Sequence, residues 1–268
     1  MKIVFLILAG GGAEHISDEK TQRITWAHNS SSLFSSIWLR AGGEFIYDDD
    51  SRVLKVPCEE NELLHKTVFG LKWLCKSVDF DIVVRTNVST FFAVDRLRDR
   101  LVNLKFDKDC FGGHLNYISD GTKADSKFFI SGTGIFLGGA AVEWLQRINL
   151  DKYELVPDDV AITRHLLGNQ NLKLKSVRCL RLSNHHMFFP ASPYVRCKSS
   201  WNSNLASRRM TLLSEYWDTQ RNTNKVLTFW RVIVFEVRSC RYSIKTAWRF
   251  PHRLLMEVRE YFLNSKFR

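Results

Sequence analysis

The sequence predicts an α/β protein with a twisted, mostly parallel β-sheet that is covered by helices on both faces. Short apolar runs rich in β-branched residues end in glycine or polar loops, as buried strands do. Segments with apolar residues at a spacing of three and four lie between these runs and are typical of amphipathic helices. The chain has 268 residues, 45% of them apolar, which suits one α/β domain with an appendage or two small domains.

The first predicted strand covers residues 3–9 and ends at three glycines. A signal peptide is the competing interpretation, but the apolar stretch is short and no small-residue cleavage pattern follows it. In chain order we then expect a broken helix over 22–40, a strand over 44–47 before an acidic turn at 48–50, a helix over 59–76, a strand over 81–85, a helix over 94–104 and a strand over 110–117.

The second half of the chain continues the alternation. Residues 128–137 (FFISGTGIFL) predict a strand, a glycine turn and a second strand. A helix is expected over 140–148 and a strand over 172–182. Between them, Pro157 and two aspartates open a helix over 160–167, where the acidic side chains suit the positive end of the helix.

The composition changes near residue 199, so we expect a domain over 1–198 and a basic, aromatic helical extension over 199–268. Residues 208–268 carry thirteen Lys or Arg and five Asp or Glu, a large part of the excess of the whole chain. Helices with Trp and Phe on one side and Arg and Lys on the other favour an anionic membrane surface. The alternative is that the apolar run at 226–237 packs on the domain while the arginines stay in solvent.

Localisation follows from two further observations. No stretch reaches the roughly 18 apolar residues that a membrane-spanning helix needs. The six cysteines form no CxxC pair, which supports neither a zinc site nor a disulfide framework. We therefore expect a cytoplasmic protein that associates peripherally with the inner face of the membrane, and no nucleic-acid partner.

Several sequence blocks resemble a known family. DFDIVVRTNVSTFF (79–92), FFISGTGIFLGGAAVEWL (128–145) and VPDDVAI (156–162) are similar to blocks of the GT-A glycosyltransferases of the β-1,3-galactosyltransferase and Fringe group. They are closer still to the bacterial and giant-virus relatives that build surface polysaccharides. RITW (23–26) and LHKT (64–67) match two further motifs, and the blocks keep the family's order across residues 1–190.

The resemblance implies the Rossmann-like GT-A fold and an inverting transfer of a hexose. The donor would be a UDP- or dTDP-sugar, and the acceptor a glycan or lipid-linked glycan in capsule, lipopolysaccharide or related surface-polysaccharide synthesis. An inverting transfer needs a base that takes the proton of the acceptor hydroxyl. By resemblance this base is Asp159, with Asp158 orienting the substrate, whereas simple capping of a helix start is the structural alternative.

The family holds a divalent metal, Mn²⁺ or Mg²⁺, with an Asp-x-Asp loop against the donor diphosphate. Asn87, Val88 and Ser89 stand at those positions here, and neutral oxygens bind these cations far less well than carboxylates. Three alternatives remain: Asn87 and Ser89 ligate the metal with help from elsewhere, Arg85 supplies the positive charge, or activity is lost. His185 and His186 are weaker candidates for binding the metal or the diphosphate, and they could equally be surface or core histidines.

The remaining candidates would bind the donor. The glycines in the SGTG segment let the backbone approach a ligand, although they also suit a plain turn. The acidic turn at 48–50 could touch the nucleoside or supply a metal site, but a solvated turn is the competing interpretation. The donor-binding candidates are Arg85, Asn87, Ser89, Lys66, Gly10, Asp49, Gly132, Thr133 and Gly134.

Two other functions compete with transfer. A catalytically inactive GT-A scaffold that binds membrane or nucleic acid would explain the basic extension and the missing Asp-x-Asp. A nucleotidyltransferase is disfavoured, because the glycines at 10–12 have no basic residue beside them.

Overall fold

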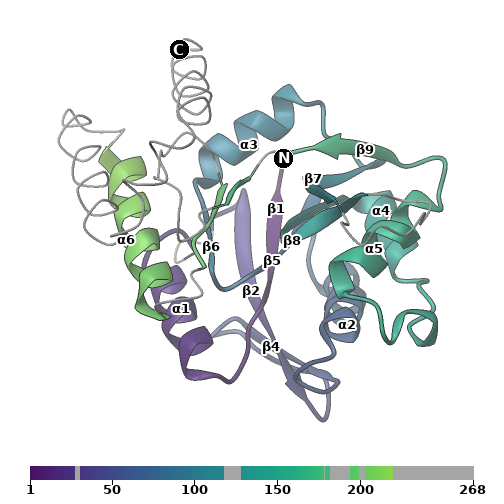
Figure 1. The fold of residues 1–268 in the computed structure, drawn as a ribbon, viewed down its shortest axis with the longest axis horizontal. Coiled ribbons are helices and arrows are strands. Elements are labelled where there is room, and N and C mark those ends of the chain that lie inside the picture. The colour runs from purple at the N-terminus through teal and green to yellow at the C-terminus, as the bar shows by residue number, and fades with distance from the viewer. Residues whose placement is uncertain (28–30, 118–127, 178, 182–193, 199–202, 220–268) are drawn as a thin grey trace.

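The computed structural model describes residues 1–27, 31–117, 128–177, 179–181, 194–198 and 203–219 (Figure 1). Its central sheet contains β1 (Ile3–Leu8), β2 (Phe34–Gly42), β3 (Ile46–Asp48), β4 (Val53–Pro57), β5 (Ile82–Asn87), β7 (Cys110–Tyr117), β8 (Phe128–Gly138) and β9 (Lys173–Ser176). The strand order is β3-β4-β2-β1-β5-β8-β7-β9. Four neighbouring pairs are parallel: β1 with β2, β1 with β5, β2 with β4, and β7 with β9. Three are antiparallel: β3 with β4, β5 with β8, and β7 with β8. The predicted α/β class with a mostly parallel sheet is confirmed.

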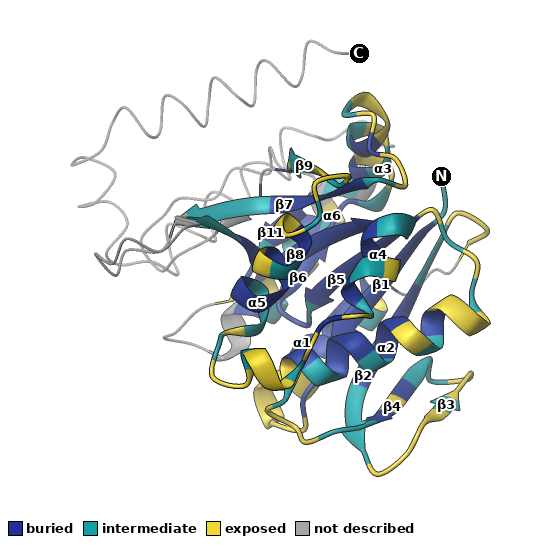
Figure 2. Ribbon diagram, turned by 90° about the vertical axis from the view of Figure 1, so that its right-hand side faces the viewer, coloured by how far each residue is buried: buried dark blue, intermediate teal, exposed yellow. Residues whose placement is uncertain are grey.

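Helices cover both faces of this sheet (Figures 1 and 2). They are α1 (Ala13–Ile24), α2 (Leu63–Ser77), α3 (Val94–Asn103), α4 (Gly139–Leu145), α5 (Asp158–Leu167) and α6 (Ser203–Thr219). The side chains of β1 pack on both faces of the sheet, since successive side chains of a strand point in opposite directions. Phe5 and Ile7 pack in the core that contains residues of α3 and α6, whereas Leu6 and Leu8 pack with residues of α2, α4 and α5.

A second, three-stranded sheet lies beside the end of β5. It contains β6 (Thr90–Phe92), β11 (Tyr194–Arg196) and β10 (Leu180–Arg181), with β11 in the middle. The rings of Phe92 and Tyr194 stack with centroids 5.3 Å apart, and Phe92 also contacts Trp26 at 5.0 Å. This aromatic packing fixes the chain that leaves β5.

The predicted broken helix over 22–40 is wrong. In the structure α1 begins at Ala13, nine residues before the predicted start, and strand β2 lies at Phe34–Gly42. Helix α1 gives little hydrophobic signal because its buried residues are polar, namely Asp18, Glu19, Thr21 and Gln22. Strand β2 is buried in its middle between β1 and β4, and a short buried apolar run cannot be assigned to strand or helix from periodicity alone.

The predicted glycine turn within residues 128–137 is also wrong, because β8 is continuous from Phe128 to Gly138. Gly134 pairs with Thr86 of β5 inside the sheet. A Cβ at Gly134 would lie 3.1 Å from the ring of Tyr194, so the glycine is explained by close packing. Its neighbour Gly132 has a similar explanation, which is given below.

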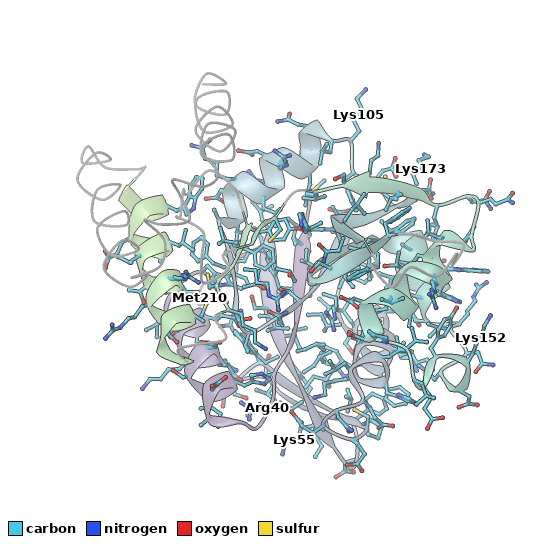
Figure 3. The ribbon with its side chains drawn as sticks, in the orientation of Figure 1. Arg40, Lys55, Lys105, Lys152, Lys173 and Met210 are labelled. Carbon is cyan, nitrogen blue, oxygen red and sulfur yellow. The ribbon has the colours of Figure 1, made fainter. Side chains whose placement is uncertain are left out.

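Helix α6 belongs to the same core as the sheet. Ala206, Met210 (labelled in Figure 3) and Leu213 are buried in the hydrophobic cluster that includes Phe5 of β1. Ser207 of α6 also donates a hydrogen bond to Asp18 of α1 at 3.1 Å. In the described part of the chain, no helix has the length and apolar character needed to cross a membrane. Most of the predicted extension, residues 220–268, lies outside the described residues.

Candidate active site

The candidate site lies where strands β1 and β5 end together. Leu8 pairs with Asn87 in parallel register, so the glycine loop after β1 and the loop after β5 leave the sheet at the same edge. Ligands of open α/β sheets bind outside this carboxyl edge of the parallel strands. Strand β8 runs antiparallel to β5, and its pair of Thr86 with Gly134 brings the SGTG segment to the same place.

An ion pair between a buried arginine and a partly buried aspartate lies in this region. Arg85 is 3% exposed, and its guanidinium is paired with the carboxylate of Asp158. The same guanidinium donates a hydrogen bond to the carbonyl oxygen of Gly132 at 2.8 Å. Gly132 has no side chain to obstruct this contact, since a Cβ there would lie 2.5 Å from Nη1 of Arg85. One arginine therefore connects β5, β8 and the first turn of α5.

Asp159 lies next to this pair in the first turn of α5. Its Oδ2 accepts the backbone N–H of Gly132 at 3.2 Å, and its Oδ1 accepts the backbone N–H of Val160 at 2.9 Å. Thr163 fastens the helix to β8, because its hydroxyl donates to the carbonyl of Asp159 at 2.7 Å and accepts the N–H of Ile130 at 2.9 Å. The carboxylate is thus held in one orientation.

Burial raises the pKa of Asp159 above its ordinary value, and the neighbouring charge of Asp158 raises it further. The N–H of Gly132 and the charge of Arg85 act in the opposite direction. A carboxylate whose pKa is raised toward the working pH is a better proton acceptor than an ordinary surface aspartate. The surroundings of Asp159 therefore suit a general base.

Hydrogen bonds among its own polar side chains stabilise the loop after β5. Oδ1 of Asn87 accepts hydrogen bonds from the hydroxyls of Ser89 at 3.1 Å and Thr90 at 2.9 Å. Nδ2 of Asn87 lies 3.4 Å from the carbonyl oxygen of Gly132. The carbonyl of Thr133 accepts from the hydroxyls of Thr86 at 2.5 Å and Thr90 at 3.2 Å. These contacts bring Asn87, Gly132 and Asp159 into one cluster at the sheet edge.

Helix α1 supports the loop from the opposite side. The side-chain amide of Gln22, which is fully buried, donates to the carbonyls of Asn87 at 3.1 Å and Thr90 at 3.0 Å. The indole N–H of Trp26 donates to the carbonyl of Thr90 at 3.1 Å. Sequence reasoning did not assign Gln22 to the site, because a buried glutamine on a polar helix gives no periodic signal. Trp26 was noted only as part of a motif.

Lys66 and Gly10 lie together at the loop after β1. Lys66 is 1% exposed, and its ammonium group donates to the carbonyls of Glu60 at 3.1 Å and Ala9 at 3.5 Å. It also lies 3.4 Å from the carboxylate of Glu60, which accepts the N–H of Gly11 at 3.3 Å. A Cβ at Gly10 would meet Glu60 at 2.9 Å. Lys66 therefore connects helix α2 to the start of the glycine loop.

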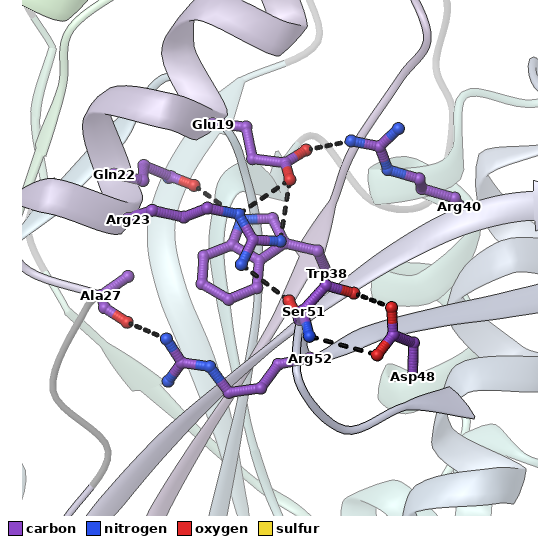
Figure 4. Close-up of polar contacts among 9 residues, drawn as sticks. All are labelled: Glu19, Gln22, Arg23, Ala27, Trp38, Arg40, Asp48, Ser51 and Arg52. Atoms are coloured by element: carbon purple, nitrogen blue, oxygen red, sulfur yellow. Dashed lines mark hydrogen bonds and ion pairs between the residues drawn. The ribbon is translucent and has the colours of Figure 1, made fainter.

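The acidic turn is separate from this cluster. Asp49 is exposed in the turn between β3 and β4, and in the sheet β2 and β1 lie between β4 and β5. Figure 4 shows the contacts around this turn: Asp48 accepts the N–H and hydroxyl of Ser51, whose carbonyl accepts Arg23 at 2.7 Å. Arg23 also stacks on Trp38, 3.6 Å from the ring centroid. These contacts tie the turn to α1.

The side chains of Asn87 and Ser89 in the loop after β5 offer only neutral oxygens to a divalent metal. Asn87 and Ser89 are neutral, and the oxygen of Asn87 already accepts hydroxyl donors. Asp158 is engaged by Arg85, and both oxygens of Asp159 accept backbone N–H groups. Across the described ranges, no three His, Cys, Asp or Glu side chains are grouped so that they could hold a metal ion. His185 and His186 lie outside the described residues.

Comparisons with known proteins found similarity among solved structures. No protein-family model matches the chain, and no curated protein matches its sequence. A similar solved structure is a glycosyltransferase involved in the glycosylation of the major capsid of PBCV-1. The identity is 11% and the TM-score 0.44, with 79% of this chain and 100% of that chain covered.

Proposed function

We propose that the chain is an inverting glycosyltransferase, which moves a hexose from a nucleotide-sugar donor to a hydroxyl of a glycan acceptor. The observation that carries the proposal is the position of Asp159. Its carboxylate has a raised pKa, is held by Gly132, and lies beside the loop after β5 at the carboxyl edge of the parallel strands. The proposal therefore places the base at the sheet edge where open α/β sheets bind their ligands.

In the proposed reaction the acceptor oxygen attacks the anomeric carbon of the donor sugar. The bond from that carbon to the acceptor oxygen forms while its bond to the phosphate oxygen breaks, so the configuration inverts. Asp159 takes the hydroxyl proton, and the nucleoside diphosphate leaves with the bonding electron pair. Asp158 is fixed by Arg85 and orients the substrate beside the base.

The donor side of the proposal rests on the two loops at the sheet edge. The glycine loop after β1 leads directly into α1, and backbone N–H groups at a helix start suit a phosphate group. Lys66 holds this loop, and Gln22 holds the loop after β5. We propose a UDP- or dTDP-sugar as the donor. The acceptor is a glycan or lipid-linked glycan of a surface polysaccharide. We propose that the chain reaches it at the inner face of the membrane through residues 220–268, the part of the basic extension that follows α6.

A thermal-shift screen of the full chain against nucleotide sugars and free nucleoside diphosphates tests donor binding. A ligand that binds only the folded state raises the melting temperature. We expect at least one UDP- or dTDP-sugar to do so, and its diphosphate to be released when an acceptor glycan is added. A donor that binds without turnover would favour the inactive-scaffold alternative, whereas no shift with any donor would contradict nucleotide-sugar binding altogether.

A further inference from the structure

The chemistry of the candidate site conflicts with the divalent cation that the sequence resemblance implies. The side-chain oxygens of Asn87, Asp158 and Asp159 already accept hydrogen bonds or an ion pair. A metal ion at this loop would have to displace hydroxyl donors from Asn87 and an arginine from Asp158. The only side-chain ligands that the loop itself would offer the metal ion are neutral oxygens, which Mg²⁺ and Mn²⁺ bind weakly.

A permanent cation is already present at this place. The guanidinium of Arg85 is buried between the carbonyl of Gly132 and the carboxylate of Asp158. A divalent ion bound to the same carboxylates would be repelled by this charge, and burial weakens the screening of that repulsion. The absence of a side chain at Gly132 fits the arginine, since a Cβ would collide with Nη1.

One N–H group of Arg85, at Nε, donates no hydrogen bond to the described residues around it. Its Nε is buried and has no hydrogen-bond partner within the described part of the chain. A buried N–H without a partner is costly, and a ligand oxygen would remove that cost. Asp158 balances the charge of Arg85 when no ligand is bound, which allows a guanidinium to stay buried.

We infer that Arg85 takes the place of the divalent cation, so that sugar transfer needs no metal at residues 87–89. This inference rests on the proposed function. Arg85 provides the positive charge beside the departing diphosphate, and it acts as a positioning residue for the base through Gly132 and Asp158. Because its charge acts to lower the pKa of Asp159, it also favours the ionised form of that carboxylate next to Asp158.

Binding of Mn²⁺ to the full chain, followed by the paramagnetic resonance signal of free Mn²⁺ with and without UDP, tests the absence of a metal site. We expect no protein-dependent binding tighter than about 1 mM in either case. In parallel, diphosphate release from the donor should stay within about twofold after treatment with a chelator, a difference well under 1.4 kcal/mol. Tight Mn²⁺ binding that Asp159→Asn abolishes, or a tenfold loss of release with chelator that Mn²⁺ restores, would overturn the inference.

The two proposals fail in distinguishable ways. If no nucleotide sugar is turned over with or without Mn²⁺, the proposed function fails, and Mn²⁺ binding then tests only whether residues 87–89 form a metal site. If turnover occurs only with Mn²⁺, the proposed function stands and the inference fails.

Arg85→Gln and Arg85→Lys test the positioning role. Removing the charge should raise the pKa of Asp159, so the acid limb of the pH–rate profile should move to higher pH in Arg85→Gln. Arg85→Lys keeps the positive charge. Its acid limb should therefore lie at nearly the same pH as that of the unmodified chain, even if its maximal rate is lower. An acid limb at the same pH in both variants would show that Arg85 does not act on the base.

Discussion

At the scale of single residues, Arg85 and Gly132 depend on each other. The guanidinium fills the space that a side chain at position 132 would occupy, and the carbonyl of Gly132 accepts its N–H. The N–H of the same glycine reaches Asp159. Motif reasoning identified these residues, but it assigned the glycine to a turn. The ion pair could not be predicted, because it depends on how α5 packs against β8.

Gly132→Ala should damage both stability and activity. The added Cβ must displace either Arg85 or the backbone that orients Asp159, and we expect a loss of about 1–3 kcal/mol in the free energy of unfolding. Denaturant titration measures this loss. Gly139→Ala is the matched control: a Cβ there meets nothing within 4 Å, so the substitution should not destabilise the protein and should raise its stability by up to about 1 kcal/mol. Equal stability of the two variants would contradict the packing described here.

Asp158→Asn should move the acid limb of the pH–rate profile to lower pH. Asp158 raises the pKa of Asp159 by charge repulsion, so removing its charge lowers that pKa, and Arg85 no longer has a carboxylate that offsets it. The ionised base then persists to lower pH. The measurement is kcat/KM as a function of pH, and a shift to higher pH would count against Asp159 as the titrating group.

At the scale of elements, α1 was the hardest to predict and has several roles. Its buried face is polar, so its amphipathic pattern is hidden, whereas α2 was predicted well because its buried face is largely apolar. The polar face holds the loop after β5 through Gln22 and contacts α6 through Asp18. Such polar contacts become visible only when the elements are packed together.

Asp18→Asn should reduce the pH dependence of stability. Burial raises the pKa of Asp18 from 3.8 to about 6, with Ser207 and Lys198 opposing the shift and Glu14 adding to it. The folded state therefore favours the protonated form, and this stabilisation is lost as pH rises from about 4 through about 6, by roughly 3 kcal/mol. The asparagine keeps an oxygen for Ser207 but does not ionise.

Melting curves from pH 4 to pH 7 measure the difference, with the exposed aspartate variant Asp99→Asn as the control. The unmodified chain should lose more stability than Asp18→Asn over this range, and Asp99→Asn should follow the unmodified chain. Identical curves for all three would mean that Asp18 ionises normally in the folded protein.

At the scale of the whole molecule, the sequence predicted the α/β class with a mostly parallel sheet. It did not predict that α6 completes the core, since residues 199–268 were assigned to a separate extension on composition alone. Ala206, Met210 and Leu213 pack with β1 residues that lie about two hundred positions earlier. Contacts at that sequence distance leave no local pattern.

A chain that ends at Thr219 should keep the folded core but lose binding to anionic vesicles, which we assign to the later residues. A chain that ends at Lys198 should lose cooperative unfolding, because it lacks the buried residues of α6. Co-sedimentation with phosphatidylglycerol vesicles, compared with phosphatidylcholine vesicles, measures binding. Retained binding by the folded chain that ends at Thr219 would rule out the proposed membrane contact.

The account depends most directly on Asp159 acting as the base at a nucleotide-sugar site. The decisive measurement is the rate of nucleoside diphosphate release with donor and acceptor, for the unmodified chain, Asp159→Asn and the surface control Asp99→Asn. We expect the control to match the unmodified chain, and Asp159→Asn to be slower by about 10²–10⁴-fold while still binding the donor. Full transfer activity in Asp159→Asn would contradict the account.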